Sequence, residues 1–435
     1  MASLHYFNPG SEAAILNASP YYTPAANQVK MQRDLAFLPA WYADSPDDYV
    51  WIEDDLTGEF LSSVSPLARL PKAISSDNLL NLMQQPVGFE ALPWGISPQS
   101  LKFFETLNGK YDWKLKIPQW KDEYIQLSNR KTAKKCLEFI IQSNSEIDKN
   151  IIPEFYSDIS AVENTVQTSE SPLLAKAPYS SSGRGLLWLP SGKLHQSEKQ
   201  IISGILKKQL FVSIEKVLDK QVDFAMLFHS DSLGKVEFAG LSLFETNPKG
   251  GYEKNIIASQ QAIQNNLSAL IDISLLEKVK NTLILFLSQT FGSIYKGCIG
   301  VDMMIYRHCE VRSNPLYKLH PCVEINLRNT MGLLALRLHQ HFLDEGSTGY
   351  FKIDFSNKSG ELLQKHQEMS KPHPVLFANG RLQSGYLSLC PVREDSKYRA
   401  SVYLRAESNC YLKFRKLPFY PLNYRGIFRF GAAKI

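Results

Sequence analysis

Two short segments late in the chain, "CIGVDMMIY" and "PCVEINLR", alternate apolar and polar residues and therefore predict two β-strands. Because successive side chains of a strand point to opposite faces, the apolar set faces a core and the polar set faces away from it. A polar stretch at 307–320 separates the two strands, which can pair as a hairpin. That pairing would bring Asp302, Glu324 and Asn326 onto one surface.

This set of two carboxylates and one amide offers only oxygen ligands, which suit Mg²⁺, with Mn²⁺ as an alternative occupant, better than zinc. Clustered carboxylates repel each other unless a cation lies between them, so a bound metal would explain why they are tolerated. The alternative is an edge of a sheet whose polar residues face water.

A chain of 435 residues exceeds what one hydrophobic core usually serves, so we expect two or three domains. With 44% hydrophobic and 21% charged residues, the composition is that of a soluble globular protein. The net charge of +5 is small for this length, and there is no long block of lysine or arginine. These features argue against a dedicated nucleic-acid binder and remain compatible with a small anionic substrate.

The cysteines and the hydrophobic runs predict a cytoplasmic protein. None of the six cysteines forms a CxxC pair, and several lie in apolar text, as in a reduced compartment. The start, "MASLHYFNPGSEAA", lacks the features of a secretory signal, and runs such as "LILFL" are too short to cross a bilayer. We therefore expect no membrane partner, while a homo-oligomer remains open.

The order of the elements predicts an α/β and α+β fold in three parts. Residues 1–127 alternate strands such as "DDYVWIEDD" with capped helices such as "SPQSLKFFETLNGKY", as in a small α/β domain. Residues 128–345 contain the densest run of strands and helices, and 346–435 form a small strand-containing extension. The extension can be a lid, a continuation of a sheet or a partner surface.

Two helices can be placed by their ends. "SNRKTAKKCLEFI" begins at a Ser/Asn cap, and its basic first turn suits either an anion docked nearby or a solvated cationic face. "SLLEKVKNTLILFLSQTFG" is predicted to begin at a capping box of Ser274 and Glu277 and to end at Gly292.

Three loops have both a functional and an ordinary interpretation. "LLAKAPYSSSGRGLLWLP" is either a flap over phosphates or a plain hairpin loop, and it is not a Walker P-loop because no GK[ST] follows. "ETNPKGGY" either lines an acceptor pocket or is a solvated turn. "FNPGSEAA" is either a ligand-binding loop or simply the start of a helix.

From about Ser128 to Phe342 the chain resembles the ATP-grasp superfamily of ATP-dependent carboxylate ligases. The motifs that carry the resemblance are "LLAKAPYSSSGRGL", "IEKVLDKQVDFAM", "GVDMMIY" and "VEINLRNTMG", in the order found in that family. The resemblance implies an ATP-grasp fold, preceded by an N-terminal α/β domain of the kind found before ATP-grasp regions.

The resemblance also implies roles for particular residues. Lys176 looks like the strand lysine that contacts ATP phosphates, and Arg130 lies where a second phosphate-contacting residue is common. Asp302, Glu324 and Asn326 match the family's ligands for one or two Mg²⁺ ions. The flexible flap over the phosphates matches Ser181, Ser182, Gly183 and Gly185. The hinge that receives adenine matches Glu215 and Leu218, and the ribose-binding position matches Asp223.

Two departures from the family pattern affect catalysis. Many ligases carry an arginine just before the metal-binding aspartate, where this chain has Gly300 and Val301. The cation that stabilises the transferred phosphoryl group would then be Arg184, Arg307 or Arg328. The second departure is a leucine within "EINLR", where proline is frequent.

The activity implied is ATP- and Mg²⁺-dependent activation of a small carboxylate as an acyl phosphate, followed by attack of an amine or similar nucleophile. Two alternatives stay open: a nucleotide-binding regulatory or scaffold protein without ligase activity, and a simple ATP-dependent phosphotransferase. The missing arginine favours the scaffold alternative, whereas the oxygen ligands and Lys176 disfavour it.

Overall fold

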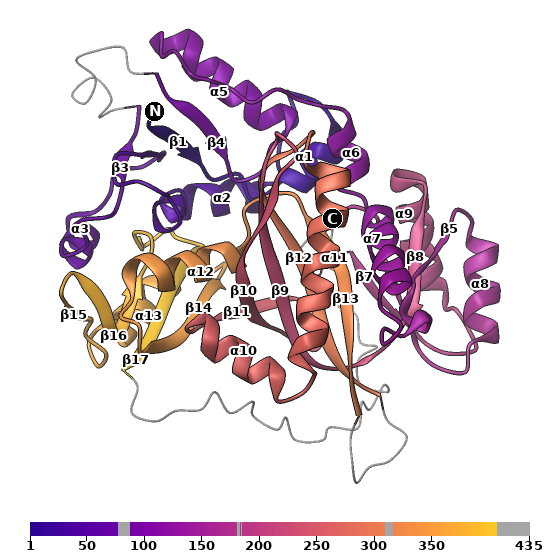
Figure 1. Ribbon diagram of the computed structural model, residues 1–435. Coiled ribbons are helices and arrows are strands. Elements are labelled where there is room, and N and C mark those ends of the chain that lie inside the picture. The colour runs from indigo at the N-terminus through magenta and orange to yellow at the C-terminus, as the bar shows by residue number, and fades with distance from the viewer. Residues whose placement is uncertain (77–87, 181–182, 184, 309–315, 407–435) are drawn as a thin grey trace.

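The computed structural model of the chain describes residues 1–76, 88–180, 183, 185–308 and 316–406. Within these residues it contains one parallel sheet, two antiparallel sheets and helices packed against them (Figure 1). The predicted mixed class, with α/β and α+β parts, is confirmed. No helix in the described ranges combines the length and the apolar character needed to cross a membrane.

The N-terminal part is built on a parallel sheet of strand order β3-β2-β1-β4. Its strands are β1 (Ser3–Tyr6), β2 (Tyr49–Trp51), β3 (Lys72–Ile74) and β4 (Glu90–Pro93). The helical elements around it are α1 (Ser11–Asn17), α2 (Ala26–Asp34), η1 (Leu38–Trp41), α3 (Gly58–Val64), α5 (Pro98–Tyr111) and α6 (Glu123–Leu127). Phe89, Phe104 and Trp113 form much of the core between this sheet and α5.

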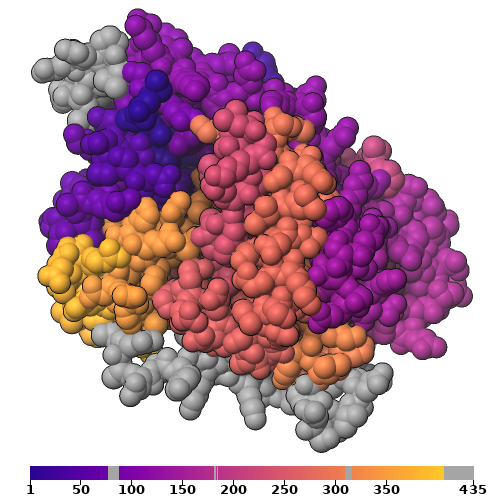
Figure 2. Space-filling view, viewed as in Figure 1, coloured from indigo at the N-terminus to yellow at the C-terminus, as the bar shows by residue number. Residues whose placement is uncertain are grey.

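A small antiparallel sheet of order β5-β8-β6-β7 lies to the right of the central sheet in Figure 1. Its strands are β5 (Glu154–Tyr156), β6 (Leu173–Lys176), β7 (Leu186–Leu189) and β8 (Val212–Lys216). The helical elements of this region are α7 (Arg130–Ser143), η2 (Lys149–Ile151), α8 (Ile159–Thr168) and α9 (Gln196–Gln209). In the space-filling view this region lies along the side of the β12–β13 part of the chain (Figure 2).

The central sheet has the strand order β13-β12-β9-β10-β11-β14-β17-β16-β15 and is antiparallel throughout the described residues. Its strands are β9 (Asp219–Asp231), β10 (Val236–Thr246), β11 (Tyr252–Ile257), β12 (Lys296–His308), β13 (Leu316–Asn326), β14 (Ser347–Phe355), β15 (Leu376–Ala378), β16 (Arg381–Ser388) and β17 (Tyr398–Ala406). The helices after β11 are α10 (Gln260–Ser268), α11 (Ile273–Phe291), α12 (Met331–Phe342) and α13 (Glu361–Ser370).

Helices α7 and α11 share one large core with β9, β10, β12 and β13. Helix α7 begins where predicted, because the side chain of Asn129 accepts a hydrogen bond from the Lys131 amide at 2.8 Å. The predicted capping box of α11 is wrong, although Gly292 does follow its last residue. Its N-cap is Asp272, whose carboxylate accepts from the Ser274 amide at 2.8 Å, so the helix starts two residues earlier than predicted.

The strands of the C-terminal part continue the central sheet, because β14 pairs with β11 from Lys254↔Lys352 to Ile257↔Gly349. Of the three alternatives left open by the sequence, the described part of this region is therefore a sheet extension. A second core joins these strands to α12 and to the N-terminal segment around Trp41. The two ends of the described chain thus stabilise each other.

Trp41 is the largest link in this second core. It is completely buried, its Nε1 donates to the Leu389 carbonyl oxygen at 2.7 Å, and its ring meets the Phe342 ring edge-on. We expect Trp41→Ala to lower the free energy of unfolding by about 3–5 kcal/mol, measured by urea titration. Tyr21→Ala, at a position that is 79% exposed, is the control and should change it by less than about 0.5 kcal/mol. A loss below about 1 kcal/mol at Trp41 would contradict this link.

Candidate active site

The two segments that alternate in the sequence form neighbouring strands of the central sheet. In the pairing of β12 with β13, Asp302 lies opposite Glu324 and Gly300 lies opposite Asn326. The intervening apolar residues, Val301 among them, are buried in the core, as the alternation predicts. The pairing register shifts between Asp302 and Met304, so a local irregularity lies directly beside the carboxylate pair.

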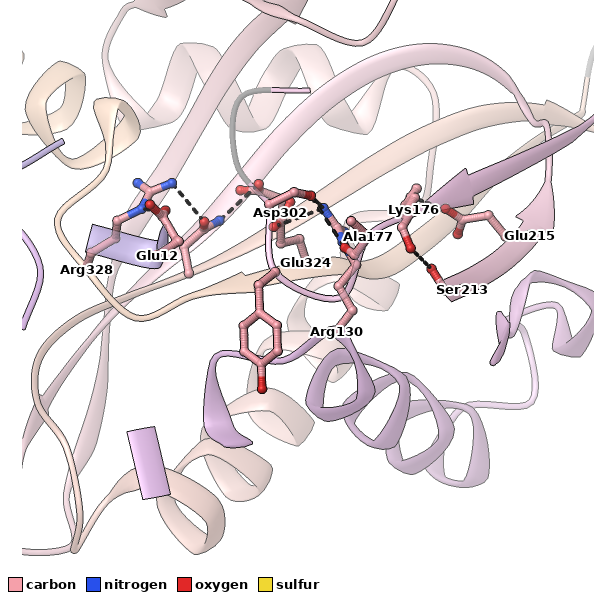
Figure 3. A network of polar contacts seen from close by, with 12 residues as sticks. Glu12, Arg130, Lys176, Ala177, Ser213, Glu215, Asp302, Glu324 and Arg328 are labelled. Carbon is pink, nitrogen blue, oxygen red and sulfur yellow. Dashed lines mark hydrogen bonds and ion pairs between the residues drawn. The ribbon is translucent and has the colours of Figure 1, made fainter. Parts of the chain in front are cut away.

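The oxygen-bearing side chains at this place belong to two sets of polar contacts, which the pairing of Asp302 with Glu324 brings side by side and which together form the network described here (Figure 3). The amide nitrogen of Asn326 donates to Asp302 at 3.1 Å, and Arg328 Nη2 donates to the amide oxygen of Asn326 at 3.1 Å. Arg130 Nη2 lies 3.1 Å from Glu324 Oε1. The three predicted metal ligands are therefore brought together, with an arginine on either side of them.

The arrangement of these side chains shifts the pKa of Asp302. Burial, then the charge of Glu324, raises the pKa of Asp302 from 3.8 to about 7, although Arg328 and the Asn326 hydrogen bond oppose the shift. A cation between the two carboxylates would relieve that repulsion, so the donor set fits a hard divalent ion. No group of three or more His, Cys, Asp or Glu side chains placed to hold a metal occurs in the described part of the chain. A Mg²⁺ here would use Asn326 as its third protein ligand and keep several waters.

Arg130 connects this network to the small sheet. It is the first residue of α7 and is buried, so the alternative of a solvated cationic face does not apply to it. Its Nε donates to the Ala177 carbonyl oxygen, directly after β6, at 3.1 Å, while its Nη2 faces Glu324. The side chain thus has one end on each sheet.

Lys176, the last residue of β6, lies on the far side of Arg130. Its side chain is 7% exposed and forms an ion pair with Glu215 of β8, so Glu215 turns its side chain toward the lysine. Ser213 Oγ donates to the Lys176 carbonyl oxygen at 3.3 Å. Leu218 follows β8 and packs, partly buried, against the central core.

The loop between β6 and β7 is described at two of its predicted positions, Gly183 and Gly185, whereas Ser181, Ser182 and Arg184 lie outside the described residues. Gly183 has φ +75°, and a Cβ added there would lie 2.7 Å from the Gly250 carbonyl oxygen. The candidate flap is therefore in direct backbone contact with the loop between β10 and β11. This second loop is the "ETNPKGGY" segment, a turn held by Asn247, whose side chain accepts from the Gly251 amide at 3.0 Å.

Asp223, the predicted ribose-binding residue, lies on β9. Its carboxylate accepts from Thr246 at 2.8 Å and pairs with Lys220 at 2.5 Å, and its charge also contributes to the raised pKa of Asp302. Asp223 is therefore near enough to Asp302 for its charge to affect the pKa of that carboxyl group, which its predicted role in binding ribose does not explain.

The structure separates the candidate cations. Arg307 pairs with Asp219, with 2.7 Å from its Nε to the carboxylate, whereas Arg328 contacts Asn326 within the network. Arg184 lies outside the described residues. Arg130, which the sequence suggested only as a phosphate contact, is the second arginine beside the carboxylates.

Glu12 belongs to the site although the sequence analysis did not select it. It lies in the first turn of α1, and its carboxylate forms an ion pair with Arg328 Nε across 316 positions of the chain. The "FNPGSEAA" segment is thus a helix start, and that start also reaches the site. The only sequence signal was the position of an acidic residue just after a Pro/Gly loop.

Two cavities adjoin the network, one on each side of the contact between Arg130 and Glu324. The first is enclosed by α7, β5, β6, β8 and β13, and its lining includes Arg130, Lys176, Ser213, Glu215 and His320. The second lies between α1 and the end of β13, and its lining includes Ser11, Glu12, Ser128, Tyr179, Glu324 and Arg328. Arg130 lines the first cavity and Glu324 lines the second, so their ion pair lies between the two.

Comparisons with known proteins place this architecture among other structures. The chain resembles N5-carboxyaminoimidazole synthetase from Staphylococcus aureus complexed with ADP, at 14% identity and a TM-score of 0.44, covering 93% of this chain and 94% of that one. It also resembles biotin carboxylase from Campylobacter jejuni, at 10% identity and a TM-score of 0.44, covering 94% and 88%. A third structure, L-amino acid ligase from Bacillus licheniformis, gives 12% identity and a TM-score of 0.41, covering 94% of each chain. No family model and no curated protein sequence matches the chain.

The raised pKa of Asp302 makes a pH-dependent prediction. Between about pH 4 and 7 the folded protein keeps a proton that the unfolded chain has lost, so the stability of the metal-free protein falls as the pH rises through this window. Asp302→Asn should therefore raise the Tm at pH 8 in EDTA by roughly 2–4 °C, and the gain should vanish near pH 4.

Differential scanning calorimetry across this pH range measures the effect. Asp47→Asn, at an exposed position, removes the same charge and is the control. Added Mg²⁺ should raise the Tm of the parent protein at pH 8 more than that of Asp302→Asn. Equal Tm values for parent and variant at pH 8 would contradict the raised pKa of Asp302. Equal effects of Mg²⁺ on both proteins would exclude Asp302 as a metal ligand.

The contact between the two loops can be tested at Gly183. We expect Gly183→Ala to force the β6–β7 loop away from Gly250, because the new Cβ would overlap a backbone oxygen. Hydrogen exchange of the 249–252 amides should then become faster. Gly192→Ala is a matched control, since Gly192 has φ +82° but no atom within 4 Å of the added Cβ. Equal exchange in both variants would show that backbone strain alone explains the effect.

Proposed function

We propose that this protein is an ATP- and Mg²⁺-dependent ligase that activates a small carboxylate as an acyl phosphate for attack by an amine or similar nucleophile. The observation that carries the proposal is the Asp302–Glu324 pair on neighbouring strands, in which the charge of Glu324 contributes to the raised pKa of Asp302. Such a pair, with Glu324 at the wall of a cavity, suits a metal ion that bridges to phosphate oxygens.

The nucleotide would bind in the cavity beside the small sheet. Arg130 and Lys176 supply two positive charges at its inner wall, where they can neutralise phosphate charge. The contact of Gly183 with Gly250 supports a role for the β6–β7 loop in covering bound phosphates. Glycine at these positions lets backbone approach closely, as a loop over phosphates requires.

Asp302, Glu324 and Asn326 would hold the Mg²⁺, which, when bound, neutralises charge on the phosphate oxygens. The protein's own contribution is positioning. Arg130 orients the phosphate end of the nucleotide cavity, and Arg328, fixed by Glu12, places a positive charge on the acceptor side.

The reaction would proceed in two steps. A carboxylate oxygen of the substrate attacks the γ-phosphorus of ATP, the bond to the β–γ bridging oxygen breaks, and ADP leaves. The amine then attacks the acyl carbon, phosphate leaves with the bonding electrons, and the amine loses a proton. Both steps need positive charge around transferring oxygens and little other chemistry from the protein, which is what the arginine and lysine side chains offer.

The carboxylate and the nucleophile would enter through the second cavity. Arg328 can bind a substrate carboxylate, while the hydroxyls of Ser11 and Ser128 have no hydrogen-bond partner among the described residues. Unpaired buried hydroxyls at a cavity wall are available to orient a small polar substrate.

Glu324 gives the sharpest test of the proposed function. We expect Glu324→Ala to lower ADP formation at least 100-fold, because it removes a metal ligand and leaves Arg130 without its partner. Glu277→Ala, at an exposed position on α11, is the control and should retain full activity.

The assay is ADP formation with a panel of small carboxylates, with and without amines, and with hydroxylamine to trap an acyl phosphate as a hydroxamate. Carboxylate-dependent ADP formation with trapped hydroxamate supports the ligase. ADP formation without carboxylate dependence would identify a phosphotransferase, and nucleotide binding with no ADP formation would identify a binding or scaffold protein.

A further inference from the structure

His320 of β13 is a buried polar side chain whose capacity for hydrogen bonding is unused. It is 2% exposed, and neither ring nitrogen has a hydrogen-bond partner among the described residues. A buried polar atom without a partner lowers stability, and few such atoms occur in folded proteins. His320 therefore lowers the stability of the ligand-free protein. A ligand that hydrogen-bonds the ring would remove this cost.

The surroundings of His320 point to such a ligand. It lines the cavity beside the small sheet, whose walls also carry the apolar side chains of Leu137, Phe155 and Val323. The other polar groups at this end of the cavity are already engaged, since Lys176 pairs with Glu215 and Ser213 donates to a backbone carbonyl. Apolar walls with one free polar group are the usual setting for a flat heterocycle.

The charge state of His320 narrows the ligand further. Burial, then the nearby charge of Lys176, lowers the pKa of His320 to about 3, so the imidazole is neutral near pH 7. A neutral imidazole has one N–H donor and one acceptor nitrogen. It suits an uncharged edge that carries both donors and acceptors, whereas a phosphate group would prefer the neighbouring cations.

We propose that His320 hydrogen-bonds the edge of the nucleotide's purine base and so contributes to recognition of adenine. The proposal rests on the proposed ATP-binding function and assigns the inner end of the first cavity to the base. The phosphates would then lie toward Arg130, which lines the same cavity and whose guanidinium contacts Glu324. His320 is four residues before Glu324, so one strand would contact both ends of the nucleotide.

Calorimetric titration with ATP and Mg²⁺ tests this assignment in three variants. His320→Leu removes both hydrogen-bonding groups at similar size, and it should weaken ATP binding about tenfold while the Tm of the free protein stays equal or rises. His320→Gln restores one donor and one acceptor and should bind ATP within about threefold of the parent protein. His339→Leu is the matched control, because His339 Nε2 is also buried without a partner but does not line this cavity.

Each result decides the matter. Unchanged ATP affinity in His320→Leu, or equal losses in His320→Leu and His320→Gln, would overturn the assignment and leave the proposed function intact. Failure of the parent protein to bind ATP would overturn both. If His320→Leu does not fold, the same comparison is made between His320→Met and His320→Gln, and a loss confined to His320→Met supports the assignment.

Discussion

The arrangement of the candidate site depends on the ion pair between Arg130 and Glu324. It spans 3.1 Å and connects the first turn of α7 to β13, which carries two of the three candidate metal ligands, while the same arginine holds the backbone after β6. On one side of this contact lie Lys176 and Glu215, and on the other lie Arg328 and Glu12 (Figure 3). Elements from three sheet regions are thereby tied to one pair of carboxylates.

The pairing of β12 with β13 holds two carboxylates close together at this place. Asp302 and Glu324 lie opposite each other on neighbouring strands, and burial, then the charge of Glu324, raises the pKa of Asp302 although Arg328 opposes the shift. His320 is a second buried polar group whose burial is not compensated, since neither ring nitrogen has a hydrogen-bond partner among the described residues. Folded proteins tolerate such local deficits where a bound molecule removes them, and stability elsewhere compensates. The large cores beneath and beside the site provide that stability.

The sequence predicted what depends on local periodicity and missed what depends on distant contacts. Alternation of apolar and polar residues placed Asp302 and Glu324 on paired strands, since side-chain direction in a strand follows from position alone. Glu12 was missed because its partner lies 316 positions away, and His320 because burial without a partner has no sequence signature. The predicted capping box of Ser274 and Glu277 does not form, because Asp272 accepts the hydrogen bond from the Ser274 amide that the Glu277 side chain would accept in such a box.

The most direct measurement is a crystal structure with a non-hydrolysable ATP analogue and Mn²⁺, with the ion located by its anomalous scattering. We expect an ion within coordination distance of Asp302, Glu324 and Asn326, with the triphosphate beside Arg130 and Lys176. A nucleotide bound elsewhere, or an ion that leaves both carboxylates free, would contradict this expectation.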